Sequence, residues 1–512
     1  VIDHNRCILC GRCIRVCKEV VANNTLDFSK RGWRTMVVAD IDQPLGESSC
    51  ISCGACTQAC PTGAIFSKVS AYRGRSSEGE IIHSLCSLCG AGCDIDVLVK
   101  DNNIVRIDGA NLTGPKGQLC VKGRFGQLYK EAPRITTPLV VDSGGTVHSS
   151  SWEEALDLAA TAIDAYMGRY GASSIAGLVS SLCPNETVEA FDNLMHRTVG
   201  TSSVDTLDGS AYRTVAQGIR TFSRNGRGLE IESPLESILE ADCVLVVGAN
   251  PLESHPVAGS YILRALTQNG ARLVVIDSQQ NELGSRADLW LQPAKDGEED
   301  LISTVISHLV AKKAKGTGKP RKVGSAAAVS ASDMDESPLV KAAGMIGSAQ
   351  NTVIVYGEGV FNRKNPALVA NILELANIAN PGGLKVISLK PRGNSRGVWD
   401  LGVANNTGIA GASIKLMYVM LGDDEYGADD WLVHAEQAEF LIVQTSYASP
   451  LTKAADVILP SPIWAERNGE YISLDGKAGR SRQVLEPPPG IRDDSEIFDQ
   501  LARILKKRRP TQ

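Results

Sequence analysis

Short runs of apolar residues alternate with amphipathic, helix-like stretches from about residue 140 to the end of the chain. The apolar runs include residues 174–179, 243–247, 273–277, 353–356 and 440–443, and helical patterns cover residues 152–167 and 366–379. In the second helical pattern, Asn365 is placed to cap the helix and Pro366 occupies its first position. Fully apolar runs separated by helical patterns indicate parallel sheets with crossover helices. We therefore predict an α/β body whose ligands bind at the carboxyl ends of the strands.

Two segments depart from this alternation. Residues 94–100 and 104–107 alternate between apolar and polar positions on either side of residues 101–103, which predicts a β-hairpin. Residues 311–337 begin with a basic stretch and continue with Ser, Ala and Asp, so we interpret them as a flexible surface segment. A basic docking patch is the alternative for this segment.

The composition excludes several classes of protein. The length of 512 residues indicates about three domains, and a content of 43% hydrophobic and 21% charged residues provides ample material for folded cores. The formal net charge is −6 and the Lys and Arg residues are scattered, so we expect no nucleic-acid partner. We expect no membrane insertion because no run of 18 apolar residues occurs. The start of the chain shows no signal-peptide pattern, and we expect a cytoplasmic protein.

Cysteine carries most of the chemical information. There are fourteen cysteines, and twelve of them lie before residue 121. They form two complete runs of the form C-x2-C-x2-C-x3-C, namely Cys7, Cys10, Cys13 and Cys17, and then Cys50, Cys53, Cys56 and Cys60. Spacing this close is wrong for paired disulfide bridges and is typical of metal ligation. Pro61 follows the second run, and this spacing is that of a protein with two [4Fe–4S] clusters.

In such paired sites the last cysteine of each run binds the cluster of the other run. We therefore assign Cys60 to the cluster of Cys7, Cys10 and Cys13. Cys17 is assigned to the cluster of the second run, whose other ligands are Cys50, Cys53 and Cys56. Zinc, which also accepts four thiolates, is the alternative metal.

A third motif follows the two runs. Cys86, Cys89 and Cys93 are separated from Cys120 by 26 residues that contain the predicted hairpin. A hairpin can return the chain so that Cys120 meets the other three cysteines, which predicts a third [4Fe–4S] cluster, with zinc as the alternative. The two remaining cysteines stand alone, and Cys243 beside an apolar run is interpreted as a buried core thiol.

The third motif, followed by residues 121–125 (VKGRF), resembles the opening of the molybdopterin oxidoreductase family, which includes formate dehydrogenases and the large iron–sulfur subunit of complex I. The strings RCILCGRC (6–13) and CISCGAC (50–56) resemble the ferredoxin module of these proteins and of NADH-linked hydrogenase subunits. Later strings continue the resemblance in order: ESHP at 253–256, RAD at 286–288, NSRGVWDLG at 394–402, ADVILP at 455–460 and ERNG at 466–469.

The resemblance implies a fold and a domain order. We expect a ferredoxin-like domain with two [4Fe–4S] clusters over residues 1–75 and a small [4Fe–4S] domain over residues 80–135. An α/β domain over 136–345 and a second α/β domain over 346–512, which returns to the cluster domain, would form the body. In the family's enzymes, the lysine equivalent to Lys122 lies between cluster and pterin, so Lys122 is a candidate cofactor-binding residue; a solvated surface lysine is the alternative.

The chain departs from the family's enzymes in ways that bear on catalysis. Those enzymes bind molybdenum or tungsten through a Cys or selenocysteine after a Gly-Thr-x-x-x-Asp string. Here residues 200–205 (GTSSVD) are followed by Ser210 and Ala211 in place of that ligand. A serine serves in some relatives, so Ser210 remains a candidate. Asp277-Ser278-Gln279 stands where Asp-Pro-Arg is common, and we expect no functional molybdenum site and no molybdopterin.

The chain also looks truncated at both ends relative to the family. It ends where the enzymes' last domain would begin, and only six residues precede Cys7, which leaves no room for the further N-terminal clusters of the complex I subunit. We therefore expect an iron–sulfur subunit of a cytoplasmic oxidoreductase complex without its own catalytic site. It would relay single electrons between a flavin-bearing, NADH-oxidising iron–sulfur subunit and a hydrogenase, ferredoxin or complex I-type partner. The alternative is the catalytic subunit of a molybdenum or tungsten formate-type dehydrogenase whose last domain is a separate chain.

Overall fold

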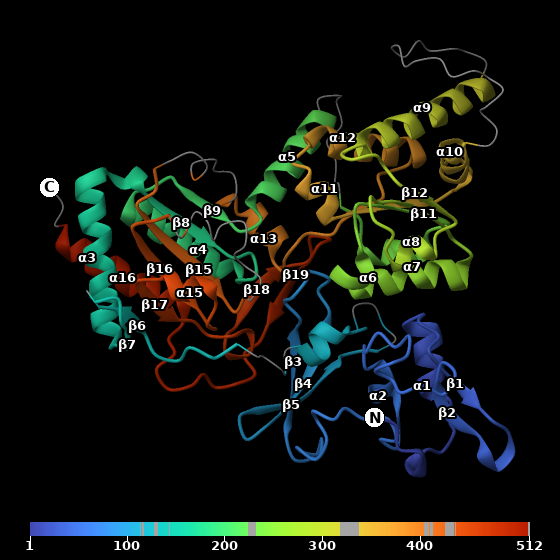
Figure 1. Cartoon of the computed structure of the whole chain (residues 1–512), viewed down its shortest axis with the longest axis horizontal. Helices are drawn as coiled ribbons and strands as arrows, with labels where there is room; N and C mark the ends of the chain where they lie inside the picture. The colour runs from blue at the N-terminus through green and yellow to red at the C-terminus, as the bar shows by residue number, and fades with distance from the viewer. Residues whose placement is uncertain are drawn as a thin grey trace. The chain divides into compact units, whose positions relative to one another are not determined.

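The structure is a computed structural model of the whole chain (Figure 1). It describes residues 1–509 except 113, 115–116, 127, 129–131, 143, 224–231, 318–336, 404–408, 410–412, 425–434 and 436. The predicted flexible segment at 311–337 falls largely outside the described residues, although helix α9 (Glu298–Thr317) extends into its first part.

The described residues form two compact units, and neither unit is a continuous stretch of chain. Unit 1 consists of Val1–Ser67, Asn111–Cys120 and Arg213–Pro391. Unit 2 consists of Lys68–Ala110, Val121–Tyr212 and Arg392–Gln512. The chain thus passes repeatedly from one unit to the other, and the four domain ranges expected from the sequence remain predictions.

Unit 1 contains a five-stranded parallel sheet in the order β12-β11-β10-β13-β14. Its strands are β10 (Cys243–Val247), β11 (Arg272–Ile276), β12 (Leu289–Leu291), β13 (Thr352–Tyr356) and β14 (Val386–Ser388). Their side chains are almost all buried, as expected for strands covered on both faces. The turn η7 (Leu235–Glu240) precedes the first of these strands, and the helices between the strands are α6 (Pro251–Ser254), α7 (Pro256–Asn269), α8 (Glu282–Ser285), α9, α10 (Pro338–Ser348), α11 (Glu358–Asn362) and α12 (Pro366–Ala379).

The N-terminal residues of unit 1 form a small module of short helical turns and one pair of strands. These elements are η1 (His4–Arg6), α1 (Arg12–Arg15), the π-helical turn η2 (Val16–Val20), β1 (Leu26–Ser29), η3 (Gly32–Arg34), β2 (Met36–Ala39) and α2 (Ala55–Ala59). Strands β1 and β2 pair antiparallel, with Phe28 opposite Val37. The predicted cap of α12 is present in the same unit, because the Asn365 side chain accepts a hydrogen bond from the N–H of Ala367 at 3.0 Å.

Unit 2 contains a seven-stranded sheet in the order β7-β6-β17-β16-β15-β8-β9. Its parallel strands are β8 (Ile175–Val179), β9 (Val204–Thr206), β15 (Leu416–Gly422), β16 (Phe440–Thr445) and β17 (Val457–Pro460), and the antiparallel pair β6 (Leu139–Val141) and β7 (Val147–Ser149) extends one edge. The helices and helical turns are η4 (Lys122–Gly126), α3 (Trp152–Tyr170), η5 (Ala172–Ser174), α4 (Asn185–Asn193), η6 (Leu194–Val199), α13 (Ser395–Asp400), α15 (Pro450–Ala454), η9 (Trp464–Glu466) and α16 (Asp494–Arg508). Helix α5 (Gly209–Ser223) begins in unit 2 and ends in unit 1.

The predicted hairpin is part of a smaller antiparallel sheet in unit 2. This sheet has the order β3-β4-β5, with β3 (Glu80–Leu85), β4 (Asp94–Lys100) and β5 (Asn103–Gly109). Asp101 and Asn102 form a two-residue turn with φ of 50° and 55°, the left-handed backbone that a tight hairpin turn requires. A separate pair of strands, β18 (Gly469–Ile472) and β19 (Ala478–Ser481), is also antiparallel.

The observed fold confirms the α/β prediction, because the five-stranded sheet of unit 1 is parallel throughout and the seven-stranded sheet of unit 2 is mainly parallel. The predicted strands at 174–179, 243–247, 353–356 and 440–443 match β8, β10, β13 and β16 to within one or two residues. Among the described residues, no helix combines the length and the apolar content needed to cross a bilayer.

Candidate metal centres

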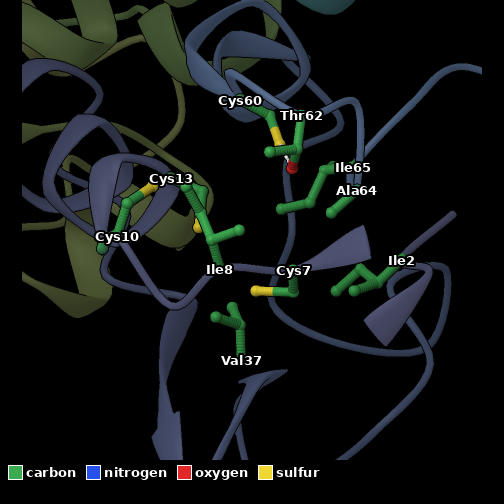
Figure 2. Close-up of a pocket in the computed structure, with 11 residues that line it drawn as sticks. Ile2, Cys7, Ile8, Cys10, Cys13, Val37, Cys60, Thr62, Ala64 and Ile65 are labelled. Atoms are coloured by element: carbon green, nitrogen blue, oxygen red, sulfur yellow. Dashed lines mark hydrogen bonds between the residues drawn. The ribbon is translucent and has the colours of Figure 1, made fainter. Parts of the chain in front are cut away.

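A pocket in unit 1 collects cysteines from both N-terminal runs. It is lined by Ile2, Cys7, Ile8, Cys10, Gly11, Cys13, Val37, Cys60, Thr62, Ala64 and Ile65, and it encloses about 370 Å³ of space between atoms, including the part open to solvent. Figure 2 shows the side chains of the four cysteines around one space bordered by aliphatic residues. We call this space the first pocket. It brings Cys60 to the same place as the first three cysteines of the opening run.

A second pocket of similar size lies in the same module. It encloses about 320 Å³ and is lined by Cys17, Val21, Asn23, Thr25, Leu26, Cys50, Ile51, Cys53, Gly54, Ala55 and Cys56. Cys17 is therefore separated from the other members of its own run and placed with the second run. The chain from Cys13 to Cys17 follows α1 and η2, so the helical turn carries the last cysteine of the run to the neighbouring pocket.

The two cysteine runs have the same local backbone conformation. Leu9 and Ser52, each two residues after the first cysteine of a run, have φ of 53°. Their N–H groups lie 3.5 Å from Cys7 Sγ and 3.4 Å from Cys50 Sγ. Glycines with φ of about 70° follow at Gly11 and Gly54, immediately before α1 and α2. Each loop therefore curls around its first sulfur and directs a backbone N–H group toward it.

Burial controls the acidity of these thiols. Burial, together with the nearby Cys53 and Cys50, raises the pKa of the Cys56 thiol to about 12. Burial also raises the pKa of Cys13. For Cys60, burial opposes ionisation, but the backbone N–H groups of Ile65 and Thr62 stabilise the thiolate and leave its pKa below the usual value. Metal binding would therefore displace protons from the buried thiols.

The donor chemistry of each pocket suits a sulfur-ligated cluster more than a single ion, because no three His, Cys, Asp or Glu side chains of the described residues are close enough together to hold one metal ion. Each pocket offers four cysteine sulfurs within an otherwise largely aliphatic lining. Thiolate sulfur is the ligand of iron–sulfur clusters and also of zinc, and an apolar shell around such a site excludes water. The residues that would hold a cluster are Cys7, Cys10, Cys13 and Cys60 in the first pocket, and Cys17, Cys50, Cys53 and Cys56 in the second.

A buried serine connects the second pocket's helical turn to the segment that precedes Cys120, all within unit 1. The Ser260 hydroxyl of α7 lies 2.8 Å from the carbonyl oxygen of Val21 and 3.2 Å from that of Val20. It accepts a hydrogen bond from the Gln118 side-chain amide at 2.7 Å. Because Gln118 is two residues before Cys120, this contact fixes the segment of chain that carries Cys120 to the elements that carry Cys17.

We expect Ser260→Ala to loosen this connection. The substitution leaves the buried Gln118 amide and two backbone carbonyl oxygens without the hydroxyl, which costs about 1–3 kcal/mol of unfolding free energy. Thermal unfolding of the cluster-loaded protein measures this change. The matched control is Ser307→Ala on α9, where an exposed hydroxyl only bonds its own helix, and the prediction fails if the two variants unfold at the same temperature.

The three-cysteine loop of the third motif lies in unit 2, between β3 and β4. Cys86 and Cys93 are buried, and the N–H of Cys86 donates to the carbonyl of Cys93 at 2.9 Å, which closes the loop. Gly90 and Gly92 have positive φ. The carbonyl of Gly90 accepts a hydrogen bond from the N–H of Leu474 at 2.8 Å. Cys120, the fourth predicted ligand, is buried in unit 1.

The basic residues after Cys120 differ in their surroundings. Lys122, the candidate named from the sequence, begins the turn η4 and is exposed. Arg124 is only 2% exposed and forms an ion pair with Asp108, while its guanidinium donates to the carbonyl of Ile107 at 3.1 Å. No pattern in the sequence singles out Arg124, because its partner is supplied by a strand that comes earlier in the chain.

Ser210 and Ala211 lie in the first turn of α5, at the position where the family resemblance places a metal ligand. Ala211 is buried and has only a methyl group, and Ser210 is half-buried with a hydroxyl as its one donor atom. Asp277 directly follows β11, and burial raises the pKa of its carboxyl group. This part of α5 therefore offers no thiolate to a metal.

Buried carboxylates lie at the carboxyl ends of strands in the large sheet of unit 2. Asp423 and Asp424 follow β15, and each accepts from an arginine: Arg467 at 2.7 Å and Arg392 at 2.6 Å. Asp208 follows β9 and accepts from three hydroxyl groups, those of Ser181, Thr206 and Ser395. Arginines thus balance the negative charge of Asp423 and Asp424, and hydroxyl groups satisfy the hydrogen-bonding capacity of Asp208, as buried carboxylates require.

The two cysteines outside the motifs are fully buried. Cys243 lies in β10, and burial raises the pKa of its thiol to about 11. Burial likewise raises the pKa of Cys183, which lies near the Arg467 guanidinium. Both thiols therefore stay protonated at neutral pH, as core residues do.

Three sequence models of known families match the chain in the order of its parts. The 4Fe-4S dicluster domain matches residues 6–64, the molybdopterin oxidoreductase Fe4S4 domain matches residues 80–129, and molybdopterin oxidoreductase matches residues 134–504. The chain therefore carries 4Fe-4S cluster domains ahead of a molybdopterin oxidoreductase body. The first two matches contain all twelve cysteines of the motifs.

Similar curated proteins are oxidoreductases by name. The chain is 26% identical over 602 residues to a probable oxidoreductase, YjgC, of Bacillus subtilis, covering 98% of this chain and 61% of the relative. It is 28% identical over 558 residues to the NADPH-Fe(3+) oxidoreductase subunit alpha of Geobacter sulfurreducens, covering 98% and 64%. A putative formate dehydrogenase of Staphylococcus aureus is 25% identical with coverage of 98% and 61%. The chain thus spans a little over three fifths of the length of these relatives.

A solved structure shares the fold. Acetylene hydratase from Pelobacter acetylenicus superposes with a TM-score of 0.62 at 16% identity, over 84% of this chain and 70% of that chain. The family match to the body covers well over half of the residues, from β6 to α16, and the cluster domain of the same family precedes it. On this evidence, the chain belongs to the molybdopterin oxidoreductase family.

Proposed function

We propose that this chain is an electron-transfer subunit that relays single electrons through three [4Fe–4S] clusters within a larger oxidoreductase. The observation that carries the proposal is the exchange of cysteines between the two N-terminal pockets. Cys60 joins the first pocket and Cys17 joins the second, which is the ligand pattern of paired [4Fe–4S] clusters. A bound cluster supplies one-electron redox chemistry at each site.

The residues of the pockets would set the properties of such clusters. The N–H groups of Leu9 and Ser52 point toward ligand sulfurs, and hydrogen bonds to sulfur raise the reduction potential of a cluster. Aliphatic residues around the sulfurs exclude water, which opposes the build-up of charge on reduction. The two pockets lie close together, since Cys56 of the second pocket packs against the hydrophobic cluster that contains Cys13 and contacts Cys60 of the first. Electron exchange between the two sites follows from that proximity.

We infer a third cluster held by Cys86, Cys89, Cys93 and Cys120. The support is the spacing of these cysteines and the match of residues 80–129 to the family's Fe4S4 domain. The hydrogen bonds from Gln118 to Ser260 and from Ser260 to the turn that carries Cys17 support a place for Cys120 on the route from the second pocket. Lys122 is exposed and is the cation closest to Cys120 along the chain. A positive charge near the third cluster would favour its reduced form.

We further propose that the body holds no catalytic molybdenum. Ala211 has no donor atom and Ser210 offers only a hydroxyl where the family's enzymes place a sulfur or selenium ligand. The carboxylates at the sheet edge of unit 2 already accept hydrogen bonds from arginines and hydroxyl groups of the chain, so these donor groups are engaged within the chain itself and not with a phosphate-bearing pterin. The body then acts as a scaffold for the third cluster and for partner chains.

The proposed partners are redox subunits. A flavin-bearing, NADH-oxidising iron–sulfur subunit would exchange electrons on one side, and a hydrogenase, ferredoxin or complex I-type partner on the other. The relative described as subunit alpha of an NADPH-Fe(3+) oxidoreductase supports an assembly of this kind. A location in the cytoplasm is part of the same proposal.

The competing function is a molybdenum or tungsten dehydrogenase of the formate type. The family membership, the relative named putative formate dehydrogenase and the hydroxyl of Ser210 favour it. In that case a pterin-bound metal would supply the catalytic chemistry, and Ser210 would be the candidate ligand.

Metal analysis of the purified, anaerobically prepared protein distinguishes the two functions. We expect about twelve irons per chain from three cubane clusters, and molybdenum and tungsten well below one per chain. One molybdenum or tungsten per chain would establish the dehydrogenase instead. Reductive titration followed by EPR adds a second criterion, because clusters that never change redox state contradict the relay.

A further inference from the structure

The module that contains the first pocket has an unusually exposed set of apolar and aromatic side chains. Trp33 is 88% exposed, Ile8 63% and Phe28 44%, although each is large and apolar. Cys10, one of the four cysteines of the first pocket, is itself exposed. Exposed apolar surface that forms one patch typically marks a place where another macromolecule binds.

The hairpin of β1 and β2 connects this exposed surface to the first pocket. Val37 of β2 lines the pocket, and Phe28 lies directly opposite Val37 in the strand pair, so both side chains lie on one face of the hairpin. A Cβ atom added to Gly11 would be 3.7 Å from the Phe28 ring and 3.4 Å from the Arg15 guanidinium. The Phe28 ring therefore packs beside the cysteine loop, and Figure 1 shows the two strands at the edge of the N-terminal module.

Positive charge surrounds the same cysteine loop. Residues 6–34 contain seven Lys or Arg and two acidic residues, in a chain whose overall formal charge is −6. The tip of the hairpin presents Lys30, Arg31 and Arg34, all exposed, and the Arg34 guanidinium lies 4.8 Å from the Trp33 ring. The Arg15 guanidinium donates to the carbonyl of Cys10 at 3.4 Å. The cations thus extend from the tip of the hairpin to the edge of the pocket.

We propose that an acidic electron-carrier protein docks on this surface and exchanges electrons with the cluster of the first pocket. We call the surface the hairpin face; it consists of Cys10, Arg15, Phe28, Arg31, Trp33 and Arg34. The proposal rests on the relay function proposed above and adds the point of entry and the charge of the partner. One electron passes from the reduced carrier to the oxidised cluster, so the carrier is oxidised as the cluster is reduced.

The chemistry of the hairpin face fits this occupant. Complementary charge attracts the carrier from a distance and orients it, which raises the rate of encounter, while Trp and Arg contribute strongly to short-lived protein interfaces. Complexes of electron-transfer proteins bury little area, so a hairpin tip and one cysteine loop are sufficient contact. Cys10, an exposed residue that also lines the first pocket, gives the carrier a short distance to the cluster.

Stopped-flow oxidation of a chemically reduced, acidic plant-type ferredoxin tests the proposal on the whole, cluster-loaded chain. We expect Arg31→Glu/Arg34→Glu to lower the second-order rate constant about tenfold at low ionic strength. The deficit should shrink as salt is added, because the Debye length falls from about 30 Å at 0.01 M to about 3 Å at 1 M. Trp33→Ala should lower the rate about threefold at every salt concentration, since it removes apolar contact and not charge.

Matched substitutions elsewhere on the surface provide the controls. Lys295→Glu/Lys341→Glu makes the same charge change at two exposed sites of unit 1, and Tyr72→Ala removes another aromatic side chain that is 92% exposed. Equal rate constants for hairpin-face and control variants at all salt concentrations would overturn the proposal. The extent to which excess dithionite reduces the clusters is measured in parallel. If the clusters are fully reduced but the hairpin-face variants react with ferredoxin as fast as the controls, only the docking site is rejected. If dithionite reduces no cluster, the relay function itself is rejected.

Two other occupants of the hairpin face would also be revealed. If the wild-type chain binds phosphatidylserine vesicles, the Glu variants do not, and all of them react with ferredoxin at the same rate, the hairpin face is a membrane contact. A dimer in sedimentation experiments that Trp33→Ala converts to monomer would make it a contact between two copies. Either result replaces the proposed partner.

Discussion

Replacing Cys17 by alanine is expected to abolish the [4Fe–4S] signal of the second pocket while the cluster of the first pocket remains. The physical reason is the position of the Cys17 side chain, which lines the second pocket with Cys50, Cys53 and Cys56. A cubane that loses one of its four thiolates loses an iron or falls apart, so this substitution has one of the two largest effects that we expect. EPR spectra of the reduced protein and the iron content measure it.

Spectral matching identifies the pocket that is affected. The spectrum of Cys17→Ala should match that of Cys53→Ala, whose cysteine belongs to the other run, and differ from that of Cys10→Ala, whose cysteine belongs to the same run. Cys60→Ala should conversely match Cys10→Ala. Cys243→Ala is the control, because it removes a buried thiol of β10 and should leave all the iron in place. Agreement between Cys17→Ala and Cys10→Ala would show that each run binds its own cluster.

The second large effect is expected for Gly393→Ala. A Cβ atom at residue 393 would lie 1.6 Å from the carbonyl oxygen of Ser87 and 2.4 Å from its carbonyl carbon, far inside contact distance. Ser87 belongs to the loop that carries Cys86, Cys89 and Cys93, so the backbone of this loop must move for the substitution to be accommodated. We expect a loss of about 3 kcal/mol in unfolding free energy and loss of the third cluster's EPR signal.

The comparison with another glycine separates this steric effect from a general effect of alanine. Gly344 lies within α10, and a Cβ atom added there meets nothing within 4 Å. Gly344→Ala should therefore be neutral or slightly stabilising, since alanine favours a helix more than glycine does. A Gly393→Ala protein with wild-type Tm and three intact cluster signals would show that the loop does not depend on this close approach.

Local patterns in the sequence determined much of this protein. The strands β8, β10, β13 and β16 and the cap of α12 follow from apolar runs and from side chains a few residues apart, because hydrophobic burial and helix capping act over short stretches of chain. The hairpin around Asp101 and Asn102 was predictable for the same reason. The spacing of the cysteines by itself indicated sulfur-ligated metal, since one tight loop must supply three ligands.

The flexible segment predicted at 311–337 shows a limit of such patterns. The structure continues α9 to Thr317, past the predicted start, because Lys and Ala favour a helix even where their charge suggests a solvated linker. The remainder of the segment, from 318 to 336, lies outside the described residues.

Tertiary structure decided the features that depend on residues far apart in the chain. Val37 and Ile65 complete the first pocket, and Ser260 meets Gln118 across 142 residues. Arg124 is buried against Asp108 on an earlier strand, and Gly393 must be glycine because of Ser87, some 300 residues before it. No periodicity or spacing reports such contacts, because they arise only when separate segments are packed together. The sequence alone thus indicated the ligands that the chain offers and the exchange of Cys17 and Cys60 between the two runs, and packing decided which other residues surround each pocket.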